Sequence, residues 1–539
     1  MPAPRRPAGQ PTRAALLEAL AERAARGEPL DLVVIGGGAT GLGVAVDAAA
    51  RGFATALVEA EDFAKGTSSR ATKLVHGGVR YLAQGDLTLV RESLRERATL
   101  LANAPHLVSP LPFLMPAYGL RERCFYGAGL VAYDLLAGRA GLGRTRFPGR
   151  AATLAACPGL RPEGLVGGVR YWDAQFDDAR LAVALARTAI AGGALVLNHC
   201  AVRGLAPAAG RSGIHGVAIE DRETGRRLEL PTRCVVNATG VWVDEVRRLD
   251  DATVEPLVAP SQGAHLVVDR TFFPSDHALL VPRTADGRVL FAVPWQGRVI
   301  LGTTDTPGAA LALEPRPLAA EIDFILSECA RYLARAPDRR DVRSAWAGLR
   351  PLVRPHGGDP RETKRLSREH AVVVSPRGLV SVTGGKWTTY RAMAEDVVDR
   401  CGAAGLLPRR AGGATRTLRL VGAPAAAAST LAMPPGLHLY GTEAGAVAAL
   451  PGADRLLLPG LTEAMVRFAA RMEYARTVED VLARRSRWLF LDAAAAATAA
   501  DDVAAILREE LREDLGGGFD AAASAAAFRA LAAGYRPAP

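Results

Sequence analysis

The chain has 539 residues, 49% hydrophobic and 23% charged, which excludes a disordered or fibrous protein and predicts two to four domains at roughly 150 residues each. The formal net charge of +10 favours anionic partners, but no Lys/Arg block with interleaved aromatics occurs, so no nucleic-acid partner is expected. The six cysteines show no CxxC or ligand spacing, which predicts reduced thiols, a cytoplasmic setting and no metal site. Neither a signal peptide nor a membrane-spanning run is recognisable.

The chain is predicted to open with a βαβ unit. Residues 14–26 form an amphipathic helix within an N-terminal extension, 1–30. The apolar, β-branched run 31–38 ends in glycines, as expected of a buried parallel strand. A helix over 39–51 and a strand over 53–59 complete the unit.

The later segments change from a parallel α/β pattern to an antiparallel one and back. The α/β pattern continues as a helix at 180–191 and strands at 194–202 and 234–240. Between about 255 and 365, short alternating runs separated by turn signals predict an antiparallel sheet. A strand at 379–385 returns to the parallel type, a helix begins near 388, and the sequence after about 405 becomes Ala-rich and is predicted to be helical.

A dinucleotide-binding pattern lies at the first strand–helix junction. Gly36, Gly38 and Gly41 form G-x-G-x-x-G, and Glu59 ends the next strand. Such glycines permit a tight turn and close approach of a pyrophosphate, which rests on the helix N-terminus, while the acid accepts hydrogen bonds from a ribose diol. A structural glycine-rich turn is the alternative, and the motif alone does not separate NAD from FAD.

Two further segments favour FAD. Residues 66–81 (GTSSRATKLVHGGVRY) are dense in hydroxyls, small residues and charge, as a segment that follows the ribityl chain to the isoalloxazine requires. Residues 382–397 (VTGGKWTTYRAMAEDV) form a glycine turn opening a helix, whose N-terminus would stabilise negative charge on a reduced flavin. A solvated loop and an ordinary strand–helix join are the respective alternatives.

Six motifs in order carry a family resemblance: IGGGATGLG, TSSRATKLVHGGVRYL, NATGVWVD, GTTDTP, the segment around GLRPL, and TGGKWTTYR. With them, the chain resembles the FAD-dependent glycerol-3-phosphate dehydrogenases of the D-amino-acid-oxidase-like group over about 31–400. A C-terminal stretch, 473–492, resembles the helical domain of that family. Trp387 departs from the small or aliphatic residue usual there, and 405–460 matches poorly.

The resemblance and the patterns together predict an α/β fold. A doubly wound, Rossmann-like FAD-binding domain, an inserted antiparallel substrate sheet and a C-terminal all-helical domain are expected. The oxidoreductase region would span 31–404, and the C-terminal domain 405–539. Within the region, the FAD-binding parts would cover about 31–110, 150–255 and 365–404, and the substrate sheet about 256–364.

Six residues are candidates for the substrate pocket. By resemblance, Arg80, Arg350 and Arg368 match arginines that bind the dianionic phosphate, for which a guanidinium fork is well suited. Lys386 would hold substrate oxygens or stabilise an alkoxide, His265 would accept the hydroxyl proton, and Tyr81 would line the pocket. The alternatives are surface cations, a buried His satisfied by backbone groups, and an aromatic core residue.

The cofactor is expected to be one non-covalent FAD. The residues assigned to it are Gly36, Gly38, Gly41, Glu59, Thr67, Ser68, Lys73, His76, Gly77, Ala201, Gly240, Gly384, Gly385 and Thr388.

The resemblance implies oxidation of sn-glycerol 3-phosphate to dihydroxyacetone phosphate, with hydride transfer from C2 to flavin N5 and electrons passed to a membrane quinone. Alternatives are a glycerol-3-phosphate oxidase that uses oxygen, a related amino- or hydroxy-acid oxidoreductase, and a non-enzymatic FAD-binding redox sensor. We expect a peripheral position on the inner face of the cytoplasmic membrane, and a homodimer stays open. The expected contact with an anionic membrane surface is 121–150, where Arg121, Arg123, Arg139, Arg144, Arg146 and Arg150 flank an apolar centre. A core helix is the alternative for this segment.

Overall fold

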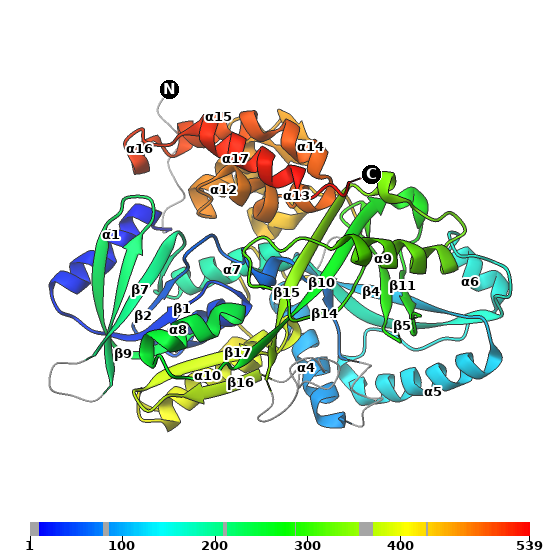
Figure 1. The fold of residues 1–539 in the computed structure, drawn as a ribbon, viewed down its shortest axis with the longest axis horizontal. Coiled ribbons are helices and arrows are strands. Elements are labelled where there is room, and N and C mark those ends of the chain that lie inside the picture. The colour runs from blue at the N-terminus through cyan, green and yellow to red at the C-terminus, as the bar shows by residue number, and fades with distance from the viewer. Residues whose placement is uncertain are drawn as a thin grey trace.

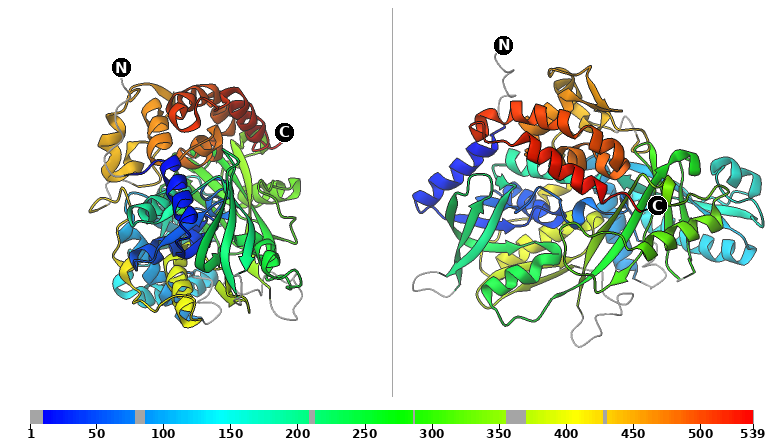
Figure 2. Two further views of the ribbon diagram at one scale, coloured as in Figure 1. Left: turned by 90° about the vertical axis from the view of Figure 1, so that its left-hand side faces the viewer. Right: turned by 45° about the horizontal axis from the view of Figure 1, so that its top comes forward.

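Two β-rich regions lie side by side and a layer of C-terminal helices covers both, as Figures 1 and 2 show. The computed structural model describes residues 10–78, 86–207, 213–285, 287–354, 370–426 and 430–538. Together with the sheets described below, this arrangement confirms the predicted mixed α/β fold with a C-terminal helical region.

The first region is built on a sheet with strand order β16-β17-β9-β1-β2-β6. Strands β17, β9, β1, β2 and β6 run parallel, and β16 joins the edge antiparallel. The bounds are β1 Leu30–Ile35, β2 Thr55–Val58, β6 Leu195–Leu197, β9 Arg227–Asn237, β16 His370–Val374 and β17 Leu379–Gly384. The predicted strand 194–202 is in fact two, because β7 (Cys200–Pro207) does not continue β6 but pairs with β8 (Ile214–Asp221), which in turn pairs with β9.

Helices pack on this sheet closely enough to require small residues. The helices are α1 Arg13–Ala25, α2 Ala39–Ala50, α7 Asp178–Ala191, α8 Val243–Asp250 and α10 Tyr390–Ala403. Within α2, a Cβ at Gly43 would lie 2.9 Å from the ring of Tyr390 on α10. Strands that are buried on both faces are largely apolar, and β1 is apolar from Leu32 to Ile35, as predicted, while β2 is apolar after Thr55.

The second region is a largely antiparallel sheet with order β14-β10-β13-β12-β11-β4-β5-β3, and β15 pairs with β10. Its strands are β3 Leu74–Val75, β4 Val108–Ala117, β5 Gly167–Phe176, β10 Val258–Asp269, β11 Ala278–Val281, β12 Leu290–Trp295, β13 Arg298–Gly302, β14 Thr306–Pro307 and β15 Ser344–Val353. The sheet therefore extends beyond the expected 256–364, since β3, β4 and β5 come from 74–176. The accompanying helices are α4 Leu87–Asn103, α5 Leu120–Ala137, α6 Arg150–Ala156 and α9 Ala319–Tyr332.

The C-terminal part becomes helical later than predicted. Among the described residues of 405–443, only short 3-10 turns occur, since prolines such as Pro424, Pro434 and Pro435 cannot continue a helix. The short strands β18 (Leu456–Leu458) and β19 (Leu461–Thr462) follow helix α11 (Ala444–Ala448). The remaining elements are α12 Glu463–Met472, a π-helical turn Asp480–Arg485, α13 Trp488–Leu491, α14 Ala493–Thr498, α15 Ala500–Glu510, α16 Arg512–Leu515 and α17 Ala521–Ala533. These helices share one hydrophobic core with the parallel sheet, so the two parts fold against each other.

Within the described ranges, every helix is too short or too polar to cross a bilayer.

Candidate functional site

The glycine-rich turn lies where β1 meets α2. Gly36 has φ +108°, and a Cβ there would approach the carbonyl oxygen of Ala238 to 2.7 Å. A Cβ at Gly41 would overlap the carbonyl oxygen of Gly36. Gly38 is the N-cap of α2 and contributes no side-chain cap. Gly36 and Gly41 therefore require glycine, and the turn presents backbone N–H groups to an anionic ligand.

Glu59 fastens this turn to the end of β2. One carboxylate oxygen accepts the N–H of Gly37 at 2.6 Å, and the other accepts the N–H of Glu61 at 2.9 Å. Burial of the group raises the pKa of Glu59. A carboxylate offers about four lone-pair sites, so acceptor capacity is left for a ribose diol. The side chain thus combines the role expected from the sequence with a structural one.

Glycines at the ends of three neighbouring strands, β1, β9 and β17, lie at one edge of the parallel sheet. Gly240 (φ +62°) follows β9, Gly384 (φ +80°) is the last residue of β17, and Gly385 (φ +72°) follows it. The indole N–H of Trp387 donates to the carbonyl of Ser68 at 2.8 Å, which ties the β17 turn to the 66–81 segment. The carboxyl edge of such a sheet is where doubly wound folds bind dinucleotides, so these residues fit FAD.

Three other residues assigned to the cofactor lie near this edge. The Thr67 hydroxyl donates to the carbonyl of Leu349 on β15 at 2.6 Å, which joins the 66–81 segment to the second sheet. Ala201 follows Cys200, whose N–H donates to the carbonyl of Glu59 at 2.7 Å. Thr388 is buried in the turn before α10. Their contact with FAD stays a prediction.

Lys73 and Gly77 have internal partners. The ammonium of Lys73 is fully buried and donates to the carboxylate of Asp178 and the carbonyl of Ser69, both at 2.6 Å. Burial and then the Arg487 guanidinium lower the pKa of Lys73 to about 7, although Asp178 opposes this. The N–H of Gly77 donates to the hydroxyl of Tyr133 at 2.8 Å. His76, between them, is partly buried, and the contact of all three with FAD stays a prediction.

His265 is buried on β10, where its ring contacts Thr72 and Trp346. One ring nitrogen, Nε2, lies 2.9 Å from the hydroxyl of Thr72, and the ring stacks on Trp346 at 5.3 Å between centroids. The residue is only 3% exposed. Burial, then the cations Arg350 and Lys73, lowers the pKa of His265 well below its usual value. The imidazole is therefore neutral at physiological pH, the form that accepts a proton.

Arg350 lies on β15 and reaches across β10 beside His265. Its guanidinium donates to the Thr303 hydroxyl at 3.1 Å and pairs with Asp305 at 3.2 Å. Gly263 makes room for this path, because a Cβ there would overlap the guanidinium. The β10–β15 register matches His265 with Trp346, four residues before Arg350, so both candidates point to the same face of the sheet.

Of the other substrate-pocket candidates, the structure describes only Lys386. Lys386 is partly buried at the start of the turn after β17, on the FAD-side edge. Arg80, Tyr81 and Arg368 lie outside the described residues. The structure thus brings His265 and Arg350 together in the second sheet and places Lys386 at the adjoining sheet edge.

Sequence reasoning missed the residues that hold these candidates. Thr72 and Asp305 each lie in a quoted motif, but only the three-dimensional structure reveals their contacts with His265 and Arg350. Trp346 lies in a strand with no motif of its own. The one available signal was the GTTDTP motif, whose acid partners Arg350.

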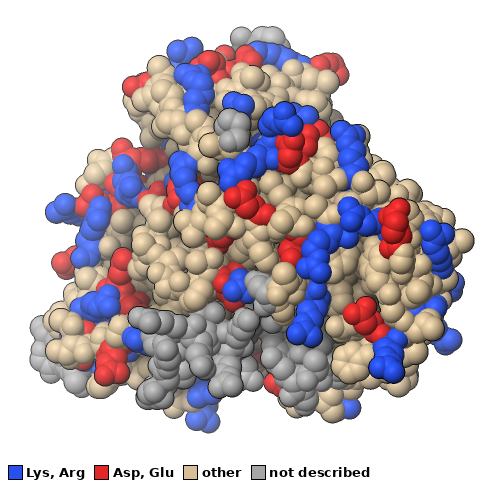
Figure 3. Space-filling view, turned by 45° about the vertical axis from the view of Figure 1, so that its right-hand side comes forward, with Lys and Arg blue, Asp and Glu red and all other residues tan. Residues whose placement is uncertain are grey.

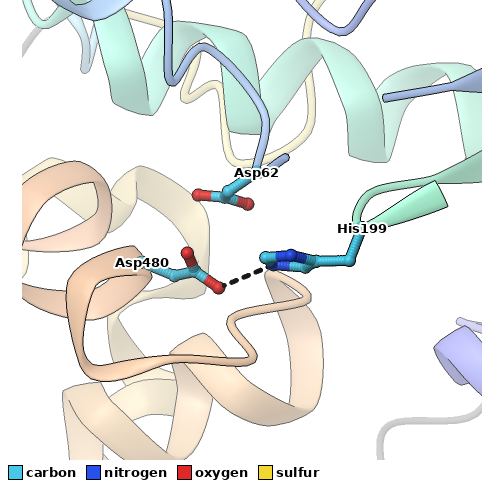
Figure 4. Close-up of side chains that lie close together, drawn as sticks. All are labelled: Asp62, His199 and Asp480. Atoms are coloured by element: carbon cyan, nitrogen blue, oxygen red, sulfur yellow. Dashed lines mark hydrogen bonds and ion pairs between the residues drawn. The ribbon is translucent and has the colours of Figure 1, made fainter. Parts of the chain in front are cut away.

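A second cluster of titratable groups lies under the C-terminal helices. Figure 4 shows Asp62, His199 and Asp480 facing one another, with ligand atoms within 4.8 Å. Both carboxylates already bind guanidinium groups: Asp62 those of Arg484 and Arg485, and Asp480 that of Arg484 at 2.7 Å. Two guanidinium groups where a cation would bind identify the cluster as an ion-pair network between domains.

Comparison with known proteins agrees with this geometry. The family model of FAD dependent oxidoreductases matches residues 31–399, and that of the C-terminal domain of alpha-glycerophosphate oxidase matches 382–515. A mitochondrial glycerol-3-phosphate dehydrogenase of Arabidopsis thaliana is 40% identical over 94% of this chain and 87% of its own length. The human mitochondrial glycerol-3-phosphate dehydrogenase is 39% identical over 90% of this chain and 71% of its own.

A solved structure supports the same assignment. The glycerol-3-phosphate dehydrogenase of Bacillus halodurans, complexed with FAD, superposes with a TM-score of 0.75 at 29% identity and covers 96% of each chain. An L-alpha-glycerophosphate oxidase of Mycoplasma pneumoniae, at 15% identity and a TM-score of 0.56, shares the fold. With both parts of the chain matched and the FAD-binding edge in place, the chain belongs to the glycerol-3-phosphate dehydrogenase family of FAD-dependent oxidoreductases.

Proposed function

We propose that this chain oxidises sn-glycerol 3-phosphate to dihydroxyacetone phosphate and passes the electrons to a membrane quinone. The observation that carries the proposal is that a neutral, buried imidazole, His265, and a guanidinium, Arg350, lie on the same face of the second sheet. FAD, when bound at the glycine edge of the parallel sheet, supplies the acceptor for the substrate hydride.

Arg350 provides the charge that a phosphate dianion requires. Its guanidinium is about a quarter exposed, and Asp305 and Thr303 hold two of its nitrogens in place. A fixed guanidinium fork binds phosphate with charge-assisted hydrogen bonds, and fixing it in advance lowers the entropy lost on binding. An amino or hydroxy acid offers this guanidinium a carboxylate with one negative charge in place of the phosphate dianion, so we expect weaker binding.

His265 provides the proton acceptor. Oxidation of the C2 carbinol removes a hydride and releases the hydroxyl proton, which a neutral imidazole can take. If the Nε2–H donates to the Thr72 hydroxyl, the lone pair lies on Nδ1, for which no hydrogen-bond partner is found among the described residues. Thr72 would then select the tautomer, as a hydrogen bond at one ring nitrogen generally does.

Anaerobic reduction of the bound flavin tests the activity. Glycerol 3-phosphate should bleach the flavin and yield stoichiometric dihydroxyacetone phosphate, whereas amino acids and lactate should not. Acid precipitation should release FAD into the supernatant, because the cofactor is held without a covalent bond. A flavin that stays oxidised under glycerol 3-phosphate would instead favour the redox-sensor alternative.

Helix α5 supports a peripheral membrane position. Leu120, Val131 and Leu135 fall on one face of this helix and are exposed, Leu135 by 78%, while Phe125, on another side of the same helix, is exposed by 73%. The opposite face is anchored by buried Tyr133. The exposed arginines around it are Arg121, Arg139, Arg144, Arg146 and Arg150. An apolar stripe about 22 Å long with basic ends is the pattern of a helix lying in the headgroup region.

The position of α5 also supports this proposal. The helix runs along the outside of the second region in Figure 1, and Lys and Arg side chains are spread over the face on that side in Figure 3. Basic residues near an anionic surface contribute about 1 kcal/mol each. A soluble acceptor such as oxygen would give no reason for this exposed apolar stripe.

Vesicle binding and acceptor choice test the position and the quinone together. The protein should sediment with anionic vesicles, partly dissociate at high salt, and reduce a ubiquinone analogue far faster than oxygen. Leu135→Glu or Phe125→Glu should abolish sedimentation, whereas Leu456→Glu, an exposed apolar residue of the C-terminal part, should not. Stoichiometric peroxide from a protein that ignores vesicles would establish the oxidase alternative.

A further inference from the structure

The C-terminal part contacts the segment that leads from the FAD edge to His265. This segment, residues 62–73, begins beyond β2 and ends at Lys73. The residues that hold it come from a short stretch of the C-terminal part, residues 480–491, which we call the clamp. The clamp consists of the π-helical turn Asp480–Arg485, Arg487 and helix α13. A π-helical turn is uncommon and often marks a functional position.

The outer contact of the clamp fixes the start of the segment. Arg484 and Arg485 both bind the carboxylate of Asp62, which is fully buried. Lys65 pairs with Glu479, adjacent to the clamp, at 3.1 Å. These pairs are shielded from solvent, so they fix geometry more firmly than surface ion pairs do.

The inner contact reaches the middle of the segment. Arg487 has a left-handed backbone (φ +66°) and a side chain with no exposed surface. Its guanidinium donates to the carbonyl of Ser69 at 2.9 Å and to the carboxylate of Asp178 at 3.0 Å. The ammonium of Lys73 donates to the same carbonyl and the same carboxylate. One guanidinium therefore organises both the backbone at Ser69 and the side chain at Lys73.

Two chains of contacts, which we call arms, connect the clamp to His265. In the first, Thr72, held between these contacts, places its hydroxyl 2.9 Å from the ring of His265. In the second, Phe490 of α13 packs edge-on against Trp346 at 5.1 Å, and Trp346 stacks on His265. The imidazole is thus bounded on two sides by groups that the C-terminal part positions.

We propose that Arg487 is a positioning residue, through which the C-terminal part fixes the FAD-contacting segment 62–73 and the proton-accepting His265. Arg487 is too deeply buried to touch substrate, and its described hydrogen bonds are to Ser69, Asp178 and Ala483. The inference rests on the proposed function, since it assumes that His265 acts on the substrate. It gives the C-terminal part a role in catalysis beyond stability.

Arg487→Lys tests the proposal without removing the buried charge. A lysine retains one positive charge but lacks the planar fork, so it cannot bind Ser69 and Asp178 in the same geometry. Arg476→Lys is the matched control. Arg476 is also buried and joins the C-terminal part to the first region, but its side chain binds Glu223 and Asp514, which belong neither to segment 62–73 nor to the clamp.

Three measurements separate positioning from stability. With substrate absent, Arg487→Lys should release FAD about tenfold faster and alter the visible circular dichroism of the bound flavin, since a charge-assisted hydrogen bond at the segment is lost. At saturating FAD, flavin reduction by glycerol 3-phosphate should slow at least about tenfold while KM changes little. Arg476→Lys should lower the melting temperature but leave FAD release, the circular dichroism of the flavin and the rate of flavin reduction at wild-type values.

The outcomes are distinguishable from failure of the proposed function. Wild-type flavin reduction by glycerol 3-phosphate is measured first, and FAD release and circular dichroism need no substrate. Wild-type release, spectrum and reduction rate in Arg487→Lys would overturn the proposal, as would equal changes in Arg476→Lys. If Arg487→Lys fails to fold, Phe490→Leu tests the second arm: slower reduction with retained FAD supports it, and an unchanged rate overturns it.

Discussion

The FAD edge of this molecule is formed mainly by backbone groups, whereas the predicted substrate face is formed by side chains. The FAD edge consists of backbone and glycine: Gly36, Gly41 and Gly240 lie at the sheet edge where we predict that the pyrophosphate binds. The substrate face consists of long side chains, His265 and Arg350, held by partners far away in the sequence. Steric overlap at the first is all-or-none, whereas loss of a side-chain contact at the second should have a graded effect.

The largest effect is expected at Gly41. In Gly41→Ala the added Cβ would overlap the Gly36 carbonyl, and backbone atoms of a buried turn cannot move aside cheaply. The purified protein should therefore contain almost no FAD. Gly129→Ala in α5, where a Cβ meets nothing within 4 Å, is the control and should retain FAD. Full flavin content in Gly41→Ala would show that the turn is not the binding site.

The next largest effect is expected at His265. His265→Gln removes the proton acceptor and should slow flavin reduction about 10²–10⁴-fold, the range typical of general-base catalysis. FAD should stay bound, because His265 lies in the second sheet and not at the glycine edge. Anaerobic stopped-flow spectroscopy measures the rate, and wild-type reduction would remove His265 from the mechanism.

This contrast also explains what the sequence predicted. The βαβ unit, the FAD edge and the antiparallel strands of 258–302 were predicted because each depends on local patterns: glycine spacing, apolar runs and alternation. The same holds for α2 and α10, which begin directly after the predicted glycine turns. The FAD cofactor and the family follow from these local motifs taken together.

The remainder could not be predicted because it depends on contacts between distant segments. Strands β4 and β5 join the second sheet from before α7, and no local pattern specifies that pairing. The break between β6 and β7 depends on pairing with β8. Arg487 resembled any other arginine in the sequence, although it is among the most completely buried side chains of the described structure.

A smaller and graded effect is expected at Arg350. Arg350→Ala removes charge-assisted hydrogen bonds to the phosphate, each about 1.5–3 kcal/mol, and should lower kcat/KM about ten- to hundredfold, mainly through KM. Glycerol, which has no phosphate, should lose much less. Asp305→Asn, which only weakens the hold on the guanidinium, should have a smaller effect in the same direction. Equal losses for both substrates would show that Arg350 is structural.

The smallest effect is expected at His199 and concerns stability alone. Burial disfavours its charged form, but attraction to Asp480, with Asp62 and Glu223 nearby, outweighs this and raises the pKa of His199 above the ordinary 6.5. A raised folded-state pKa contributes stability that is complete below the unfolded value and is lost as pH rises through the folded value. The melting temperature of the wild type should therefore exceed that of His199→Gln at about pH 6, and the difference should shrink towards pH 9. His215→Gln, on β8, is the control for loss of a histidine outside this ion-pair network. A difference between the wild type and His199→Gln that grows with pH would mean that the imidazole is neutral in the ion-pair network.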